Sequence, residues 1–258
     1  MLSFSTEVTS SHIMSDNPLF QRTLKAYYLI SDKISGEVLE IGCGEGYGIN
    51  IIIKQTNKLT VLDKSKNVLN KIKHKHPKIE VLHQKTPPLN NIADNSFDVV
   101  ISFQVLEHIK ETSLFIKEIH RVLKPNGKAY ITTPNSKKTI ARNPWHYKEF
   151  NYQEINNIFK DYFKDYKVEG IQGNEKTDLY YLKNKQSVQR FLRFDIFKIQ
   201  YKIPALLLKI PYEISNRINR TKLLKSNTEL VNSITLEDYT LDGYSCKTLD
   251  FFCTLTKE

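Results

Sequence analysis

The chain has little cysteine: Cys43, Cys246 and Cys253 are three residues among 258, and no two of them form a CxxC pair. An odd, scattered set provides neither a disulfide framework nor zinc-ligand spacing, and it indicates a reducing compartment. No apolar run approaches the ~20 residues that a membrane span requires, and the N-terminus lacks the basic start and apolar run of a signal peptide. We therefore expect a cytoplasmic protein that holds no metal.

Apolar runs alternate with helical patterns along most of the chain. Strands are predicted at about 37–42, 58–63, 79–83, 97–103, 127–133, 166–172 and 248–256, and helices near 18–33, 46–55, 65–75, 111–123 and 151–163. Such alternation predicts an α/β fold, in which helices cover both faces of a mostly parallel sheet.

The first predicted strand ends in a glycine-rich turn, E-I-G-C-G-E-G-Y-G, over residues 40–48. Glycine lets the main chain approach a ligand closely, and the N-terminus of the following helix adds N–H donors. A dinucleotide fingerprint requires G-x-G-x-x-G, but Tyr47 stands where its third glycine would be. The spacing is similar instead to motif I of the S-adenosylmethionine-dependent methyltransferases, E/D-x-G-x-G-x-G.

Further motifs follow in order. Asp63 ends the second predicted strand, where a carboxylate can accept both hydroxyls of a ribose. Next come D-N-S-F-D-V-V (94–100), L-E-H-I (106–109) and R-V-L-K-P-N-G (121–127). With these motifs, residues 18–173 and the C-terminal strand strongly resemble the ubiquinone/menaquinone-biosynthesis-like branch (methyltransferase type 11/23) of the class I S-adenosylmethionine-dependent methyltransferases.

That resemblance implies a Rossmann-like, seven-stranded sheet in the order 3-2-1-4-5-7-6, with the last strand antiparallel. S-adenosylmethionine would lie at the carboxyl ends of strands 1 and 2 and would leave as S-adenosylhomocysteine, and no metal is expected. The residues expected to bind it are Glu40, Gly42, Cys43, Gly44, Tyr47, Asp63, Lys64, Gln84, Ser102, Phe103 and Gln104.

Methyl transfer needs placement of the nucleophile and often a base that takes its proton. Candidates lie on loops after two strands: His108 follows the fourth, and His146 and Glu149 follow the fifth, in N-P-W-H-Y-K-E-F (143–150). His146 is the first choice, since the pKa of histidine lies near neutrality. The alternative is a histidine that hydrogen-bonds Glu149 and holds the loop in place, and for His108 the alternative is packing.

About seventy-five residues separate the last two predicted strands, where a hairpin joins them in the plainest relatives. We expect residues 1–173 and 248–258 to form the methyltransferase domain and 174–247 to form an inserted helical lid, since the insertion is too long for a structureless loop. Its centre, 183–225, holds eleven basic and two acidic residues, which is +9 of the chain's net +10. Pro204 and Pro211 predict its division into two or three short helices.

The basic, apolar insertion has three interpretations. It can be a lid whose apolar side covers the acceptor while its lysines are solvated. It can also rest on an anionic membrane, which would make the protein peripheral to the membrane rather than purely cytoplasmic. Nucleic acid is the least favoured partner, because the rest of the chain is nearly neutral and carries no recognisable RNA-binding module.

The sequence thus predicts an S-adenosylmethionine-dependent methyltransferase that acts on an O, N or C nucleophile of a small molecule or of a glycan or lipid intermediate. One alternative is a non-catalytic protein that retains the S-adenosylmethionine or nucleotide pocket. The other is an NAD-dependent oxidoreductase, which Tyr47 and the L-E-H-I and L-K-P-N-G motifs disfavour.

Overall fold

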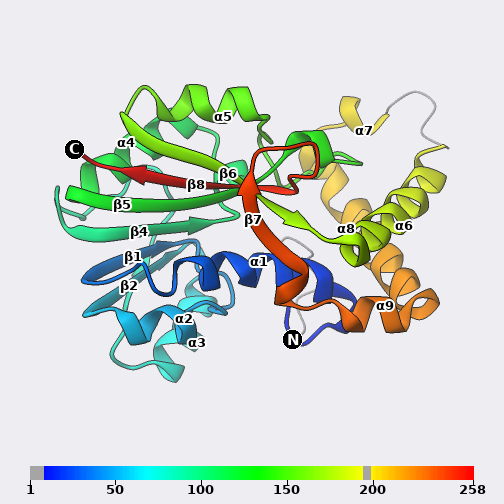
Figure 1. The fold of residues 1–258 in the computed structure, drawn as a ribbon, viewed down its shortest axis with the longest axis horizontal. Helices are drawn as coiled ribbons and strands as arrows, with labels where there is room; N and C mark the ends of the chain where they lie inside the picture. Colours follow the sequence, from blue (N-terminus) through cyan, green and yellow to red (C-terminus); the bar gives the residue numbers. More distant parts are fainter. Residues whose placement is uncertain (1–8, 194–198) are drawn as a thin grey trace.

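A computed structural model of the chain describes residues 9–193 and 199–258. Within them, eight strands form one sheet in the order β3-β2-β1-β4-β5-β8-β6-β7 (Figure 1). The strands are β1 (Glu37–Ile41), β2 (Lys58–Asp63), β3 (Glu80–His83), β4 (Phe97–Phe103), β5 (Leu123–Pro134), β6 (Asp165–Gly173), β7 (Tyr239–Gly243) and β8 (Asp250–Thr256). The pairs among β1 to β5 are parallel, and β8 runs antiparallel to both β5 and β6.

The predicted sheet order is confirmed for seven of these strands, but the predicted number of strands is wrong. The eighth, β7, comes from the stretch assigned to the insertion and pairs antiparallel with β6 at the sheet edge. Its sequence, Y-T-L-D-G, has no apolar run, and only Tyr239 is buried. The strand conformation of such a polar segment depends on pairing with its neighbour more than on its own residues.

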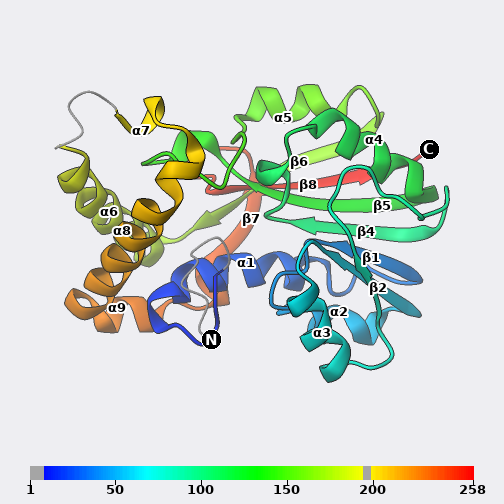
Figure 2. The ribbon, with the colours of Figure 1, turned by 180° about the vertical axis from the view of Figure 1, so that it is seen from behind.

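Helices cover both faces of the sheet, as predicted. α1 (Asn17–Ile30), α2 (Ile49–Ile52) and α3 (Lys66–Lys75) pack on one face, and α4 (Thr112–Val122) and α5 (Tyr152–Phe159) pack on the other (Figures 1 and 2). Successive strand residues point to opposite faces, so Val38 joins one hydrophobic cluster and Leu39 the other. Short 3-10 turns occur at Met14–Asp16, Ile53–Gln55, Leu106–His108, Ser136–Lys138 and Leu236–Asp238.

The insertion forms a helical layer beside the β6–β7 end of the sheet (Figure 2). Its helices are α6 (Glu175–Leu192), α7 (Ile199–Lys202), α8 (Ala205–Ser226) and α9 (Thr228–Ser233). Pro204 precedes α8 as predicted, but the break predicted at Pro211 is wrong, because this proline lies inside α8. Pro211 cannot donate to the carbonyl of Leu207, and the exposure of this stretch lets water satisfy that carbonyl.

Two basic residues of the insertion have structural roles. Arg217 and Arg220 contact the same oxygen of the fully buried Asp16, at 2.9 and 3.0 Å. Next to Asp16, Asn17 donates its side-chain amide to backbone carbonyls of the segment after α9 and of α9 itself. The insertion is therefore fastened to the start of α1. Lys198, counted in the predicted basic segment, lies outside the described residues. Across the described ranges, every helix is too short or too polar to cross a bilayer.

Candidate functional site

The glycine turn after β1 has the conformation that its sequence predicts. Gly42, Gly44 and Gly46 have φ angles of +75°, +50° and +76°, which glycine adopts without strain. A Cβ on Gly42 would lie 2.4 Å from a methyl group of Val105, so side-chain packing also requires glycine there. The N–H of Gly42 donates to the carbonyl of Leu62 on β2 at 2.7 Å. The turn therefore lies against the carboxyl end of β2.

Asp63, at that end of β2, is buried and joined to the turn. Its carboxylate accepts the N–H of Gly44 at 3.3 Å and the N–H of Ser65 at 2.8 Å. The Sγ of Cys43 lies 4.0 Å from the same carboxylate, and burial raises the pKa of this thiol. Lys64 follows on the surface. The main chain thus fixes the orientation of the Asp63 carboxylate.

Glu40, on β1, is 1% exposed and contacts α1. The hydroxyl of Tyr27 donates to its Oε1 at 2.6 Å, while its Oε2 has no hydrogen-bond partner among the described residues. Burial raises the pKa of Glu40 to about 7, the hydrogen bond from Tyr27 opposes the shift, and the charge of Asp63 adds to it. Glu40 therefore has an oxygen ready for a donor or a cation.

Two more predicted residues carry buried polar atoms of this kind. In the described part of the chain, neither the Oγ of Ser102 on β4 nor the Nε2 of Gln84 after β3 has a hydrogen-bond partner. The backbone N–H of Gln84 donates to the carbonyl of Asp63, which ties it to the same edge of the sheet. Buried polar groups nearly always have hydrogen-bond partners. These atoms are therefore suited to a polar ligand that lies across the carboxyl ends of the strands.

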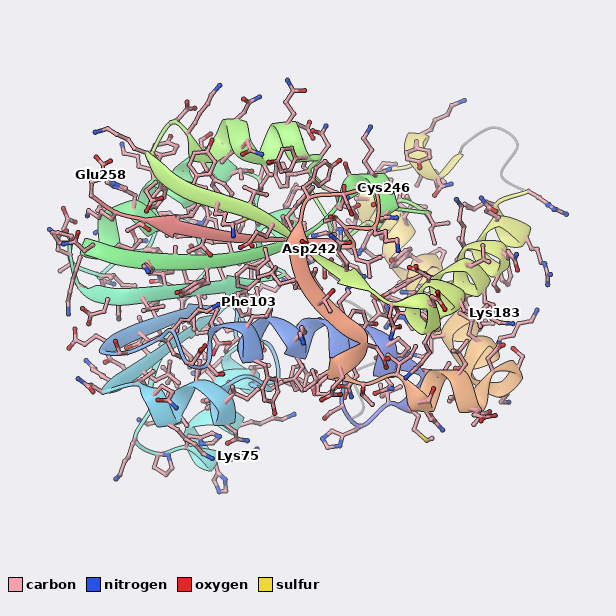
Figure 3. The ribbon with its side chains drawn as sticks, in the orientation of Figure 1. Lys75, Phe103, Lys183, Asp242, Cys246 and Glu258 are labelled. Atoms are coloured by element: carbon pink, nitrogen blue, oxygen red, sulfur yellow. The ribbon has the colours of Figure 1, made fainter. Side chains whose placement is uncertain are left out.

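The remaining predicted cofactor residues lie around the carboxyl ends of these strands. Phe103 packs edge-to-face on Tyr27, with ring centroids 4.9 Å apart, and Figure 3 shows it where β4 meets α1. Gln104 has φ of +57°, an uncommon conformation for a residue other than glycine, and its N–H donates to the carbonyl of Thr132. Tyr47 packs edge-to-face on Phe20, and its hydroxyl donates to the carbonyl of Thr9. A positive φ angle in a residue other than glycine, as at Gln104, is typical of functional sites.

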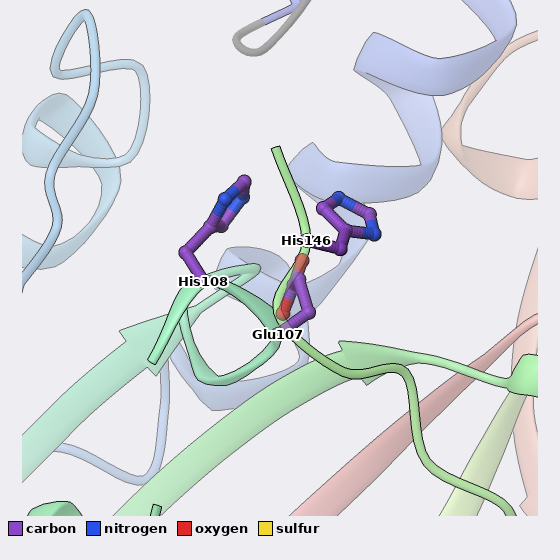
Figure 4. A group of neighbouring side chains, drawn as sticks. All are labelled: Glu107, His108 and His146. Carbon is purple, nitrogen blue, oxygen red and sulfur yellow. The ribbon is translucent and has the colours of Figure 1, made fainter. Parts of the chain in front are cut away.

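Beyond Gln104, the chain forms a compact group of acidic and histidine side chains, shown in part in Figure 4. The rings of His108 and His146 lie 4.8 Å apart and nearly perpendicular. Glu107 is 1% exposed, accepts the hydroxyl of Thr133 at 3.0 Å, and has its pKa raised to about 7 by burial, against the opposing charge of His146. Ligand-type atoms of the three side chains in Figure 4 lie within 4.8 Å of one another, so a metal would find donors here.

His146 and Glu149 form the contact that their spacing suggests. The Nδ1 of His146 lies 2.6 Å from a carboxylate oxygen of Glu149. Its Nε2 lies 2.8 Å from the side-chain nitrogen of Asn143, whose amide oxygen accepts the N–H of Trp145 at 3.0 Å. Burial alone would raise the pKa of Glu149, but hydrogen bonds from His146 and Thr139 lower it below its ordinary value. Both ring nitrogens of His146 are thus hydrogen-bonded within its own loop.

A backbone carbonyl fixes the tautomer of His108. Its Nδ1 lies 3.0 Å from the carbonyl oxygen of Trp145. Since a carbonyl only accepts, Nδ1 must carry the proton, and the Nε2 of a neutral His108 is the unprotonated nitrogen. The carboxylate of Glu149 likewise keeps the proton on the Nδ1 of His146, so both histidines have the tautomer of a proton acceptor. They differ in that the Nε2 of His146 accepts the side-chain N–H of Asn143.

The sequence analysis missed an ion pair beside this group. Arg22 on α1 reaches the 1% exposed Asp250 at the start of β8, with 2.8 Å between Nε and Oδ2, and also donates to the hydroxyl of Tyr181 on α6 at 3.1 Å. Burial raises the pKa of Asp250, while Arg22 and Gln104 oppose the shift. The two charges lie at opposite ends of the chain, so no local pattern reveals the pair.

The insertion contacts the loop that carries His146. The indole N–H of Trp145 donates to Glu213 on α8 at 2.6 Å, and the ammonium of Lys209 lies 3.7 Å from the centre of the indole ring. Arg142 donates to the backbone carbonyls of Gln200 and of a residue before α8. The position of the loop therefore depends on α7 and α8.

Known proteins resemble this chain in sequence. Residues 39–131 match the profile of the family described as methyltransferase domain. A Mycolicibacterium smegmatis protein described as a probable S-adenosylmethionine-dependent methyltransferase is 30% identical over 165 residues, which are 62% of this chain and 64% of that protein. A ubiquinone biosynthesis O-methyltransferase of Rickettsia conorii is 31% identical over 106 residues, 40% of this chain and 36% of that protein. The chain thus spans less than two thirds of the length of these curated relatives.

The fold also resembles solved structures. An S-adenosylmethionine-dependent methyltransferase from Thermotoga maritima superimposes with a TM-score of 0.57 at 14% identity, over 95% of this chain and 91% of that one. At this identity the likeness concerns the fold alone, and it confirms the predicted Rossmann-like architecture. Together with the glycine turn, Asp63 and the sheet order, the sequence match identifies residues 39–131 as a methyltransferase domain, similar to that of relatives described as S-adenosylmethionine-dependent.

Proposed function

We propose that the protein transfers a methyl group from S-adenosylmethionine to an O, N or C nucleophile of a small molecule or of a glycan or lipid intermediate. The observation that carries the proposal is a set of buried polar atoms of Glu40, Ser102 and Gln84 beside the glycine turn, which have no hydrogen-bond partner among residues 9–193 and 199–258. When bound, the cofactor supplies a methyl group on a positively charged sulfur, which a lone pair displaces in line to leave S-adenosylhomocysteine.

The side chains at the carboxyl ends of the strands can each bind a different group of this cofactor. The fixed carboxylate of Asp63 would accept hydrogen bonds from the ribose hydroxyls. The Oε2 of Glu40 would accept a hydrogen bond from the cationic amino group. Gln84 and Ser102 would hydrogen-bond its remaining polar groups. The turn at Gly42 lets the main chain approach closely, and the other predicted residues, Cys43, Gly44, Tyr47, Lys64, Phe103 and Gln104, would complete the walls.

The acidic and histidine group would remove the proton of the acceptor. His108 is assigned as the base. Its Nδ1–H points to the Trp145 carbonyl and leaves Nε2 unprotonated, whereas the unprotonated Nε2 of His146 already holds the amide of Asn143. The buried carboxyl of Glu107 would stabilise the imidazolium that forms. His146 and Glu149 would hold the loop, since both ring nitrogens of His146 are already hydrogen-bonded. No metal is assigned to the group, because a ligand bond to the Nε2 of His146 would displace the amide of Asn143.

The insertion would cover the acceptor. Residues 174–247 supply the lid, and residues 1–173 with 248–258 supply the catalytic domain, although β7 belongs to the sheet. Support comes from α8, which contacts the loop of His146 through Trp145. Acceptor selectivity would then depend on the lid, and deletion of 183–225 should broaden or abolish acceptor use while S-adenosylhomocysteine still binds.

Two measurements test the proposal. Calorimetric titration should show binding of S-adenosylhomocysteine and no comparable binding of NAD, and tight NAD binding would favour the oxidoreductase. Incubation with methyl-labelled S-adenosylmethionine and fractionated metabolite, glycan and lipid extracts should label an acceptor. A protein that bound S-adenosylhomocysteine but labelled no fraction would be the non-catalytic binding protein instead.

A further inference from the structure

The large hydrophobic side chains left exposed by the fold gather in the insertion. Of fourteen such residues in the described ranges, nine lie between positions 174 and 226. Five belong to α8, with exposed fractions from 54% to 76%: Leu206, Leu207, Ile210, Ile214 and Ile218. A concentrated exposed apolar patch on a protein surface marks a site of interaction.

These residues form one row along α8. Leu207, Ile210, Ile214 and Ile218 recur every three or four positions, which places them on the same side of a helix. The other side of α8 packs inward, where Glu213 meets Trp145 and Arg220 is buried. The exposed row is therefore a surface distinct from the side that contacts the loop of His146.

Two lysines extend this row toward the C-terminal end of α8. Lys222 and Lys225 follow Ile218 at helical spacing and are exposed. The one acid within α8, Glu213, is turned toward Trp145. The exposed side of α8 is thus apolar in its first half and basic in its second.

We propose that this exposed row, Leu207 to Lys225, docks on an anionic phospholipid bilayer. The leucine and isoleucine side chains would enter the boundary between headgroups and acyl chains, while the lysines would meet the negative headgroups. Pairing with a second copy would bring two basic surfaces together, which like-charge repulsion opposes. Nucleic acid would match the lysines but leave the apolar half exposed to water.

Docking would place the proposed acceptor site close to lipid. An α-helix with its side chains is about 10–12 Å across. The inner side of α8 holds Trp145, next to His146, so the loop would lie about one helix diameter from the headgroups. A methyl acceptor carried by a membrane lipid could then reach the loop of His146 from the docked surface. This last step rests on the proposed methyl transfer, whereas the docking does not.

Vesicle sedimentation of the full chain tests the docking. Vesicles of phosphatidylcholine mixed with phosphatidylserine should bind the protein, and vesicles of phosphatidylcholine alone should not. Affinity should fall with salt as the screening length shrinks from about 10 Å at 0.1 M to about 3 Å at 1 M. At about fivefold per lysine near the surface, Lys222→Glu with Lys225→Glu should weaken binding by at least about thirtyfold.

Two further variants separate surface contact from overall charge. Ile210→Gln with Ile214→Gln keeps good helix formers and should weaken binding at least about tenfold, because the apolar contact is lost. Lys71→Glu with Lys75→Glu makes the same charge change on α3, on another part of the molecule (Figure 3), and should change affinity less than about threefold. A circular dichroism spectrum and a denaturant midpoint equal to those of the parent would confirm that each variant is folded.

Three results would overturn the docking. One is equal sedimentation with neutral and anionic vesicles. Another is undiminished binding by the isoleucine or the Lys222 and Lys225 variants. The third is a lipid-free dimer in analytical ultracentrifugation that Ile210→Gln with Ile214→Gln abolishes, which would assign the row to a second copy. None of these depends on methyl transfer, so failure of the docking and failure of the enzymatic assignment are distinguishable.

Discussion

Tyr27, on the helix beside the glycine turn, donates its hydroxyl to the buried carboxylate of Glu40 across 2.6 Å. Its ring also fills the space beside Gly48, where a Cβ would lie 1.9 Å from the Tyr27 Cε1. One tyrosine thus holds α1 against both β1 and the turn, and closes one side of the proposed cofactor site. Within the described ranges, this hydroxyl is the one hydrogen-bond donor to the Glu40 side chain, which is 1% exposed, so the charge of the carboxylate is poorly compensated.

The charge of Glu40 should make stability depend on pH. The pKa of Glu40 is raised from 4.5 to about 7 in the folded protein, so folding favours its protonated form. Its stabilising contribution is therefore full below pH about 4.5 and is lost as the pH rises through about 7. The loss should be on the order of 3 kcal/mol, at 1.36 kcal/mol per pKa unit. Denaturant unfolding of the ligand-free protein should show stability falling over this range, less steeply in Glu40→Gln.

Glu107 provides the comparison for that measurement, because burial raises its pKa to about 7 as well. Glu107→Gln should remove a similar part of the pH dependence, and the double variant should remove most of both parts. Only Glu40→Gln should also weaken S-adenosylhomocysteine binding. A Glu40→Gln protein with the parent's pH dependence would show that Glu40 titrates normally.

Alanine at Gly42 should be far more costly than alanine at Gly243. At Gly42 the φ angle is +75° and a Cβ would lie 2.4 Å from Val105, whereas at Gly243 nothing lies within 4 Å of a Cβ. Left-handed strain of about 1–2 kcal/mol and overpacking of about 1–3 kcal/mol should together destabilise Gly42→Ala by about 2–5 kcal/mol. Gly243→Ala should stay within about 0.5 kcal/mol of the parent. Thermal and denaturant unfolding measure both, and equal losses would contradict the role of the turn.

Asp63 should control cofactor affinity in graded steps. Asp63→Ala would remove the acceptor for two ribose hydroxyls and for the N–H groups of Gly44 and Ser65. We expect S-adenosylhomocysteine binding to weaken by about 2–4 kcal/mol. Asp63→Asn, which keeps one acceptor oxygen, should weaken it less. Calorimetry that found the parent's affinity in Asp63→Ala would disprove the assigned role.

The sequence predicted the half of the fold that carries the glycine turn because its signals are local. The run from Phe97 to Phe103 is apolar enough to be buried on both faces, and its predicted bounds match β4. The P-N-G sequence predicts a turn before a strand that begins at residue 127. The structure instead starts β5 at Leu123, and Asn126, with φ of +64°, lies where the pairing with β4 shifts register. The positions of Asp63 and Gln104 at strand ends follow equally from where the apolar runs stop.

Features that depend on distant residues could not be predicted in the same way. β7 exists through its pairing with β6, and Y-T-L-D-G alone has no strand pattern. Pro211 lies inside α8, which is fastened elsewhere by Arg220 and Asp16, a contact between opposite ends of the chain. The hydrogen-bond partners of His146 and His108 likewise required the folded loop, because the sequence could suggest Glu149 but not Asn143 or the Trp145 carbonyl.

Asp16 should be a large contributor to stability. It is fully buried against Arg217 and Arg220, and Asp16→Asn would leave the largely buried Arg220 without its counter-charge. Breaking one partner of a buried ion pair costs about 3–5 kcal/mol. Hydrogen exchange should show earlier opening of α8 in this variant. The exposed pair of Lys58 and Glu80 is the control, where Glu80→Gln should cost less than about 1 kcal/mol. A small loss at Asp16 would mean that α8 is held by other contacts.

The two histidines should separate into a base and a positioning residue once an acceptor is known. His108→Gln keeps a side-chain N–H for the Trp145 carbonyl but removes the proton acceptor, so kcat should fall about a hundredfold or more at constant S-adenosylhomocysteine affinity. His146→Gln loses the contact with Glu149 and should raise the acceptor KM and lower stability, leaving the pH profile of kcat unchanged.

The pH profile decides between the assignments, because a loop-holding histidine does not move it. The acidic limb of kcat should disappear in His108→Gln, since it reports protonation of the Nε2 that receives the acceptor's proton. If instead His146→Gln lost that limb and the turnover while keeping its stability, the base would be His146. The amide of Asn143 would then have to leave its Nε2, and Asn143→Ala should raise kcat or leave it unchanged. A fall in kcat for Asn143→Ala together with a retained limb in His146→Gln would keep the base at His108.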